Sequence, residues 1–269
     1  MSFKYKPIGI IGVAGSGKDT VAALIQSRLF SKNLARYDLY AFADPVKTFV
    51  LGVFKLDDKY ATDRALKEAQ IKFSLSESKF RSNFEYYLNR VVDKLSRSNE
   101  FYDSVREEIA NRPIHTKSAF DDIMYDKFIE VIAGEIHTPW WVKLSKRLGV
   151  DDGKIYFKTT PRRLFQLAGT DFFRNHVRES VWIEIAPYHN TILTDVRFQN
   201  EADAVSEHGG KLIEVINSNN TSGTVQSSHS SETTVKSIKS DIKLYNSGTC
   251  MLQLTEEVDR VIQELVDGK

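Results

Sequence analysis

Residues 12–18 read Gly-Val-Ala-Gly-Ser-Gly-Lys, and their types and spacing suit the binding of phosphate. Glycines let backbone N–H groups turn inward around an anion, and a helix that starts at the lysine presents the positive end of its dipole. Lys18 adds a charge for the β- and γ-phosphates of a nucleotide. We therefore predict a phosphate-binding loop whose members are Gly12, Val13, Ala14, Gly15, Ser16, Gly17, Lys18, Asp19 and Thr20. The alternative is a glycine-rich turn with a surface lysine.

The loop departs from the strict motif, which has Ser or Thr directly after the lysine. Here Asp19 takes that place and Thr20 follows it. A GTPase switch needs the hydroxyl immediately after the lysine for magnesium, and the chain also lacks the Asn-Lys-x-Asp guanine motif. Kinases of small molecules often tolerate the G-K-x-T order. We predict a magnesium site at Asp19 and Thr20 with help from Asp195, because magnesium usually keeps several waters that carboxylates can hold. Asp19 as a base for the acceptor stays open.

Two consecutive arginines, Arg162 and Arg163, fall in the first turn of a predicted helix. A cation at that end opposes the helix dipole by a few tenths to about 1 kcal/mol. The pair suggests a compensating anion, and a guanidinium group suits a phosphate because it can donate two parallel hydrogen bonds. The alternative is that both side chains simply extend into water.

Asp195 ends an apolar strand, which is the position from which nucleotide-binding α/β folds direct residues at their ligand. From there it can hold magnesium through water or accept hydrogen bonds from a substrate. Arg197 and Glu201 follow at two and six residues. Two alternatives remain: Asp195 can be a strand-end cap, and Glu201 is favourable in the first turn of any helix.

The elements that position these residues alternate between strands and helices. Pro45 is predicted to end the second strand, Thr160 and Pro161 to start a helix, Asn200 to cap the next helix, and Gly209-Gly210 to end it. The spacing of the later elements fits a parallel crossover. Strands are expected over 8–12, 36–47, 190–195, 211–216 and 241–248, and helices over 20–30, 159–176, 200–208 and 250–266.

Two stretches differ from this pattern. Between residues 56 and 157, apolar side chains recur at helical spacing among charges, which predicts a largely helical insertion that ends in a short hairpin near 151–158. Residues 217–234 are nearly all Ser, Thr, Asn and Gly, a composition that cannot bury itself and predicts a mobile loop.

Composition excludes several protein classes. The 269 residues include 37 Lys and Arg against 36 Asp and Glu, so bulk positive charge is not available to grip nucleic acid. Cys250 is the only cysteine, so neither an internal disulfide nor a cysteine-based zinc site is possible. No apolar run reaches the length of a membrane span. We expect a soluble intracellular protein with no membrane association and no stable nucleic-acid binding.

Five segments in order resemble the deoxynucleoside monophosphate kinases of tailed bacteriophages. They are "GVAGSGKDT" (12–20), "AFADPVK" (41–47), "TPRRLFQLAGTDFFRNH" (160–176), "TDVRFQNEADA" (194–204) and "HSSE" (229–232). The resemblance spans about residues 8 to 248 and implies a P-loop kinase fold, an α/β fold with a mostly parallel sheet flanked by helices. On this basis the chain is one domain, 1–269, with the insertion at 56–157 on the acceptor-binding side and a lid-like loop at 217–240.

The resemblance also implies an activity and roles for individual residues. The expected reaction moves the γ-phosphoryl group of ATP to deoxynucleoside monophosphates with Mg²⁺, for phage DNA synthesis in the cytoplasm of an infected bacterial host, by a monomer or homodimer. Catalytic roles are expected for Lys18, Arg162, Arg163, Asp195 and Arg197, and acceptor binding for Asp44, Lys47, Arg162, Arg163, Trp182, Asp195, Arg197 and Glu201. Trp182 is alternatively a core residue, and His229 a solvated side chain in its polar tract.

Two other functions compete with this one. The first is a P-loop kinase for another small phosphate-bearing acceptor, such as dephospho-coenzyme A. The second is an ATP-binding module without an acceptor. Such a module has no need for arginines at a helix start together with the Asp195–Arg197–Glu201 group.

Overall fold

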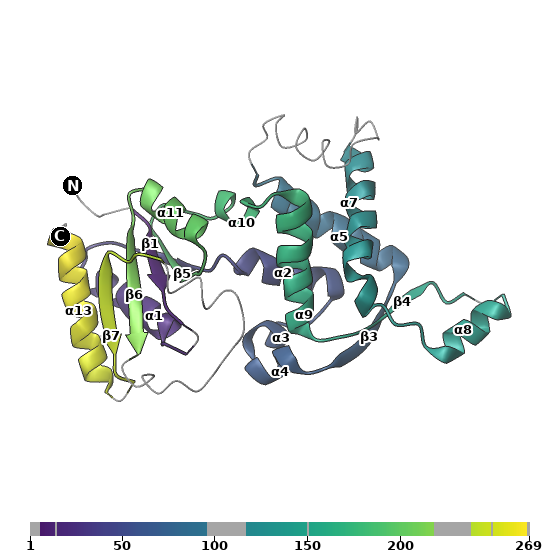
Figure 1. Cartoon of the computed structure of the whole chain (residues 1–269), viewed down its shortest axis with the longest axis horizontal. Coiled ribbons are helices and arrows are strands. Elements are labelled where there is room, and N and C mark those ends of the chain that lie inside the picture. The colour runs from purple at the N-terminus through teal and green to yellow at the C-terminus, as the bar shows by residue number, and fades with distance from the viewer. Residues whose placement is uncertain are drawn as a thin grey trace. The chain divides into compact units, whose positions relative to one another are not determined.

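The computed structural model describes residues 6–13, 15–95, 117–149, 151–217, 238–248 and 250–267, and it divides the chain into two compact units (Figure 1). The sheet unit comprises Met1–Phe42 and Ala186–Lys269, and the helical unit comprises Ala43–Ile185. The predicted insertion at 56–157 is therefore narrower than the helical unit, which also contains Asp44, the arginine pair and Trp182.

The sheet unit is built on five parallel strands in the order β2-β5-β1-β6-β7. Three helices complete the described part of this unit. The elements are β1 Ile8–Ile11, α1 Lys18–Ser31, β2 Asp38–Tyr40, β5 Thr191–Val196, α11 Gln199–Glu207, β6 Lys211–Asn217, β7 Ile242–Asn246 and α13 Met251–Asp267. The predicted α/β fold with a mostly parallel sheet flanked by helices is confirmed.

Different helices cover the two faces of the sheet, and alternate side chains of each strand point to one face or the other. Ile8 and Ile10 pack with buried side chains of α1 and α13 in one hydrophobic cluster. Gly9 faces the other way, where a Cβ atom would lie 3.3 Å from a methyl group of Val205 on α11. Figure 1 shows α13, in yellow, beside β7.

Two local predictions in and next to the sheet unit were wrong. The second strand covers Asp38–Tyr40 alone, and Pro45 does not end it but starts a helix, since a proline suits the first helical turn. Asn200 does not cap α11 either. The N-cap position is Phe198, and Glu201 satisfies the backbone there.

The described part of the helical unit combines helices with one two-stranded antiparallel sheet, β3-β4. The predicted strand near 151–158 exists, but its partner is Ile71–Ser76 rather than a neighbouring hairpin segment. The elements are α2 Asp44–Phe54, α3 Lys59–Thr62, α4 Arg64–Glu68, β3 Ile71–Ser76, α5 Glu77–Val92, α7 Lys117–Ile132, η1 Ala133–Glu135, α8 Trp140–Arg147, β4 Lys154–Thr159, α9 Pro161–Gln166, η2 Leu167–Val177 and α10 Val181–Glu184.

Aromatic side chains form the core of the helical unit. Phe49 of α2 meets Phe173 edge to face, with ring centroids 4.8 Å apart, and Phe84 of α5 stacks on Phe128 of α7 at 5.0 Å. These arrangements are the ones that aromatic quadrupoles favour. Phe84 and Phe128 lie in the stretch where apolar side chains recur at helical spacing, and both are buried on helices.

Candidate active site

The phosphate loop connects β1 to α1, as its sequence predicts. Gly15 and Gly17 have φ angles of +78° and +89°, a region that residues with a Cβ rarely adopt. Gly17 is the N-cap of α1 and has no side chain to cap it, so the helix start depends on another acceptor for its first N–H groups. The Lys18 ammonium donates to the carbonyl of Val13, 3.1 Å away, which folds it back over the loop. Ala14 lies outside the described residues.

Ser16, in the same loop, is fully buried. Within the described part of the chain its hydroxyl has no hydrogen-bond partner. A buried hydroxyl without a partner costs free energy, so such a group in a glycine loop fits a site that receives a polar ligand. A Cβ atom on Gly12 would lie 2.6 Å from the Ser16 Oγ, which explains the glycine at the start of the motif.

Asp19 and Thr20 are exposed in the first turn of α1, beside the loop. Among the residues that the structure describes, no three His, Cys, Asp or Glu side chains lie close enough to form a metal cage. That absence is compatible with magnesium, which is usually bound through one or two carboxylates together with substrate phosphates.

Asp195, in β5, accepts a hydrogen bond of 2.7 Å from the backbone N–H of Phe42, which follows β2. Its carboxylate thus links two neighbouring strands, in agreement with the structural alternative for this residue. Glu201 is 2% exposed, and its carboxylate accepts from the N–H groups of Arg197 and Phe198 at 2.9 and 3.3 Å. Glu201 therefore holds the start of α11, whereas the Arg197 side chain is exposed.

The arginine pair opens α9 in the helical unit. Thr160 caps this helix as predicted, accepting from the N–H of Arg163 at 3.2 Å. The side chains are about half exposed, and each has carboxylate partners: Arg162 pairs with Glu68, and Arg163 with Glu135 and Asp171 at 3.5 and 3.8 Å. The anions that offset these cations in the structure are the protein's own. Exposed pairs of this kind contribute about 0–1 kcal/mol, so a phosphate can replace them.

Trp182 does not present its ring to a ligand, contrary to the prediction that it stacks on a base. It is 2% exposed, its Nε1 donates to the carbonyl of Gly169 at 3.0 Å, and its ring packs on Phe173 with centroids 4.9 Å apart. The physical reason is that Trp182 is buried in the core together with Val181, and the indole N–H finds an acceptor there. The structure supports the alternative reading of Trp182 as a core residue.

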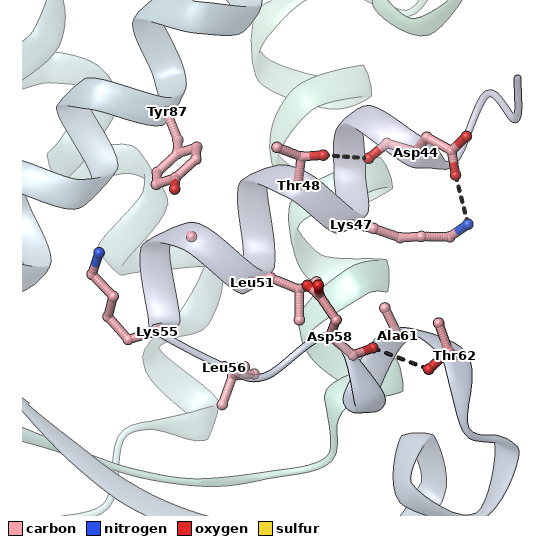
Figure 2. Close-up of a pocket in the computed structure, with 11 residues that line it drawn as sticks. Asp44, Lys47, Thr48, Leu51, Lys55, Leu56, Asp58, Ala61, Thr62 and Tyr87 are labelled. Atoms are coloured by element: carbon pink, nitrogen blue, oxygen red, sulfur yellow. Dashed lines mark hydrogen bonds and ion pairs between the residues drawn. The ribbon is translucent and has the colours of Figure 1, made fainter.

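A groove of about 690 Å³ runs along α2 (Figure 2). Asp44 and Lys47, both predicted to bind the acceptor, line it and form an ion pair of 2.7 Å. Tyr87 of α5 points its phenol end at α2, where a Cβ on Gly52 would overlap the ring. The lining residues are Asp44, Lys47, Thr48, Leu51, Gly52, Lys55, Leu56, Asp58, Ala61, Thr62 and Tyr87.

Comparison with known proteins identifies the family. The family model described as deoxynucleotide monophosphate kinase matches residues 6–257, which is most of the chain. The chain belongs to the deoxynucleotide monophosphate kinase family. It is thus a nucleotide kinase, an enzyme whose substrates are nucleotides.

Two viral relatives of this kinase are similar over different lengths. The deoxynucleoside-5'-monophosphate kinase of Escherichia phage T5 is 25% identical over 210 residues, which cover 74% of this chain and 71% of the relative. A protein of Acanthamoeba polyphaga mimivirus, named as a proposed deoxynucleotide monophosphate kinase, is 34% identical over 113 residues, or 35% of this chain and 57% of its own.

Sequence reasoning missed several residues around these sites in the kinase. Asn246, at the end of β7, contacts the phosphate loop, and Lys55, Asp58 and Tyr87 line the groove. Tyr87 precedes Leu88 and lies off the buried Phe80–Phe84–Leu88 stripe, which is the one local signal for a separate role. Nothing in the sequence around Asn246 points to residue 16, because the two are 230 positions apart.

Two predictions lie partly or wholly outside the described residues. Of the lid-like loop at 217–240, residues 218–237 are not described, and these include His229 and the rest of the "HSSE" segment.

Among the helices described, none is both long and apolar enough to span a bilayer.

Proposed function

We propose that this kinase transfers the γ-phosphoryl group of ATP to the phosphate of deoxynucleoside monophosphates, with Mg²⁺, and so supplies deoxynucleoside diphosphates for viral DNA synthesis. In the reaction an oxygen of the acceptor phosphate bonds to the γ-phosphorus while the bond to the β–γ bridging oxygen breaks, and ADP leaves. The phage origin of the first relative supports the biological setting.

The observation that carries the proposal is the phosphate loop. Two glycines in left-handed conformation, a buried hydroxyl at Ser16 and Lys18 at the start of a long helix together make an anion site. Phosphoryl transfer depends mainly on positioning and on electrostatic stabilisation, both of which such a loop supplies. Lys18 offsets charge on the transferring group, and its contact with Val13 keeps the ammonium near the loop in the meantime.

Asp19 and Thr20, with Asp195, would hold the magnesium ion. Exposed oxygen ligands beside a phosphate loop fit the preference of magnesium for oxygen. When bound, the ion neutralises phosphate charge. The Phe42 N–H occupies one oxygen of Asp195, so we assign this carboxylate a contact through water rather than the principal role.

We assign binding of the acceptor phosphate to side chains that can exchange their ion-pair partners. Arg162 and Arg163 would exchange Glu68, Glu135 and Asp171 for phosphate oxygens. The groove along α2 is large enough for a nucleotide and offers the cations Lys47 and Lys55. Arg197 is exposed and remains assigned to the transfer step, whereas Glu201 serves through the N–H groups that it holds.

A coupled assay of ADP release tests the proposal. The full chain is given ATP and Mg²⁺ with each deoxynucleotide, its ribonucleotide counterpart, dephospho-coenzyme A or no acceptor. We expect release with several deoxynucleotides and slower release with ribonucleotides, since a pocket rejects one added hydroxyl by only about 10². Equal rates for both sugars indicate a general nucleoside monophosphate kinase. Release with dephospho-coenzyme A alone, or independent of any acceptor, contradicts the proposal.

A further inference from the structure

The last residue of β7 reaches the phosphate loop. The Nδ2 of Asn246 donates to the carbonyl of Ser16 at 2.9 Å, and the Asn246 side chain is buried, with 8% of the residue exposed. The contact joins the end of one strand to a loop that is 230 residues away in the sequence. The buried amide thus has a defined acceptor for its nitrogen.

The orientation of the Asn246 amide is determined by its second bond. Its Oδ1 accepts from the N–H of Gly248 at 3.0 Å. Because the oxygen is engaged by a donor in its own turn, the nitrogen is the end that faces Ser16. The turn after β7 and the phosphate loop are thus connected through one side chain.

Gly17 is adapted to this contact as well as to its backbone conformation. A Cβ at position 17 would lie 2.4 Å from the Asn246 Nδ2, and the φ angle there is +89°. Any other residue would push the amide away from the Ser16 carbonyl. Two separate physical reasons therefore favour glycine at position 17: the positive φ angle and the close approach of Asn246.

From these contacts we infer that Asn246 is a positioning residue for the phosphate loop. In a trans peptide the C=O and N–H groups point to opposite sides. By holding the carbonyl of Ser16, Asn246 turns the N–H of Gly17 away from β7 and keeps it available to a phosphate oxygen. The inference rests on the proposed function, in which this loop binds the phosphates of the donor nucleotide.

Loss of the Asn246 side chain should therefore weaken binding of the donor nucleotide and leave binding of the acceptor unchanged. Loss of the Asn246 donor leaves the Ser16 carbonyl buried without its partner, so the peptide is no longer held in one orientation. The groove along α2 has no contact with Asn246 in its lining, so binding of a deoxynucleoside monophosphate depends on other residues.

The test measures binding of a fluorescent ADP analogue without metal, at pH 8 and pH 5.5, with thermal melting recorded for every protein. Asn246→Leu removes both hydrogen bonds. Asn246→Asp keeps an acceptor for Gly248 but has no donor when ionised, and its protonated form regains one. Ile242→Val, in the same strand, is the control because it weakens the buried packing of β7 without touching the loop.

We expect Asn246→Leu to bind the ADP analogue at least about tenfold more weakly at both pH values. Asn246→Asp should be as weak at pH 8 and recover to within about threefold of the parent at pH 5.5, since burial favours the protonated carboxyl. Ile242→Val should bind as the parent does, and all four proteins should bind a deoxynucleoside monophosphate equally.

Three outcomes would overturn the inference. In the first, Asn246→Leu binds the ADP analogue as tightly as the parent, which makes the contact dispensable. In the second, Ile242→Val binds as weakly as Asn246→Leu at equal melting temperature, which attributes the effect to strand stability. In the third, Asn246→Asp stays weak at pH 5.5. Failure of the parent to bind the ADP analogue overturns the proposed function of the loop, and the inference with it.

Discussion

The phosphate loop of the sheet unit and the arginine pair of the helical unit, to which we assign the donor and the acceptor in the proposed function, are held in different ways. The phosphate loop is shaped by glycine backbone, a buried Ser16 and the buried amide of Asn246. The arginines of α9 are about half exposed and are held by carboxylates that solvent can reach. A site made of backbone is organised before its ligand arrives, whereas a site made of exposed ion pairs is organised by the exchange of partners.

This contrast has an energetic basis. Reorganising the loop requires moving buried backbone and polar groups, each of which costs about 1–3 kcal/mol when it loses its partner. Replacing an exposed ion pair changes the free energy by about 0–1 kcal/mol. We therefore expect substitutions in the loop and at the arginines to affect activity, but substitutions at the arginines to leave folding almost untouched.

The largest effect is expected at Lys18. Lys18→Ala removes the charge at the loop, and turnover should fall at least ~10²-fold while melting stays close to that of the parent. The measurement is steady-state ADP release at saturating substrates. Lys32→Ala, just beyond the other end of α1, is the matched control and should keep full turnover. Near-normal turnover of Lys18→Ala would remove the lysine from the mechanism.

Arg163→Ala should lower kcat/KM for the acceptor by ~10²-fold, with melting nearly unchanged. Its partners Glu135 and Asp171 lie near the surface, so they can be solvated when the guanidinium is lost. Arg81→Ala, which removes another exposed ion-paired arginine of the same unit, should leave kcat/KM alone. A lower melting temperature with intact catalysis would show that Arg163 is structural, and would remove the contrast between the two units.

Trp182→Phe sharpens the comparison, because it tests a predicted acceptor residue that the structure places in the core. The substitution leaves the Gly169 carbonyl without its donor and should destabilise the protein by about 1–3 kcal/mol, measured by urea unfolding. The ratio of kcat/KM between different deoxynucleotides should not change. Trp141→Phe, at an exposed position, is the control for loss of an indole. Unchanged stability with altered base preference would restore the stacking role.

The smallest effect is expected at Asp19. Asp19→Ala should raise the magnesium concentration for half-maximal activity by roughly threefold to tenfold, since waters can replace one carboxylate around this ion. Nucleotide binding in metal-free buffer should be much less affected. A magnesium titration that overlays the parent's would assign the Asp19 carboxylate another task, such as acting as a base toward the acceptor.

The sequence alone determined the features that depend on neighbouring residues. The glycine loop, the α1 helix, the Thr160 cap and the buried stripe through Phe80 and Phe84 follow from local backbone preferences and periodicity, and each is present. The same local reasoning failed at Pro45, because a proline ends a strand and starts a helix equally well.

Only the tertiary structure decided which side chains are free to act. The pairing of Ile71–Ser76 with β4 joins residues far apart in the chain, and the burial of Trp182 depends on how its ring packs on Phe173 of another helix. The hydrogen bond from Asn246 to Ser16 is of the same kind. It forms because β1 and β7 are strands of one parallel sheet, so that the end of β7 and the loop after β1 lie at the same edge. A hydrogen bond or a buried contact requires two groups to be close in space. The pattern of residue types along the chain does not say which distant segments become neighbours in the fold.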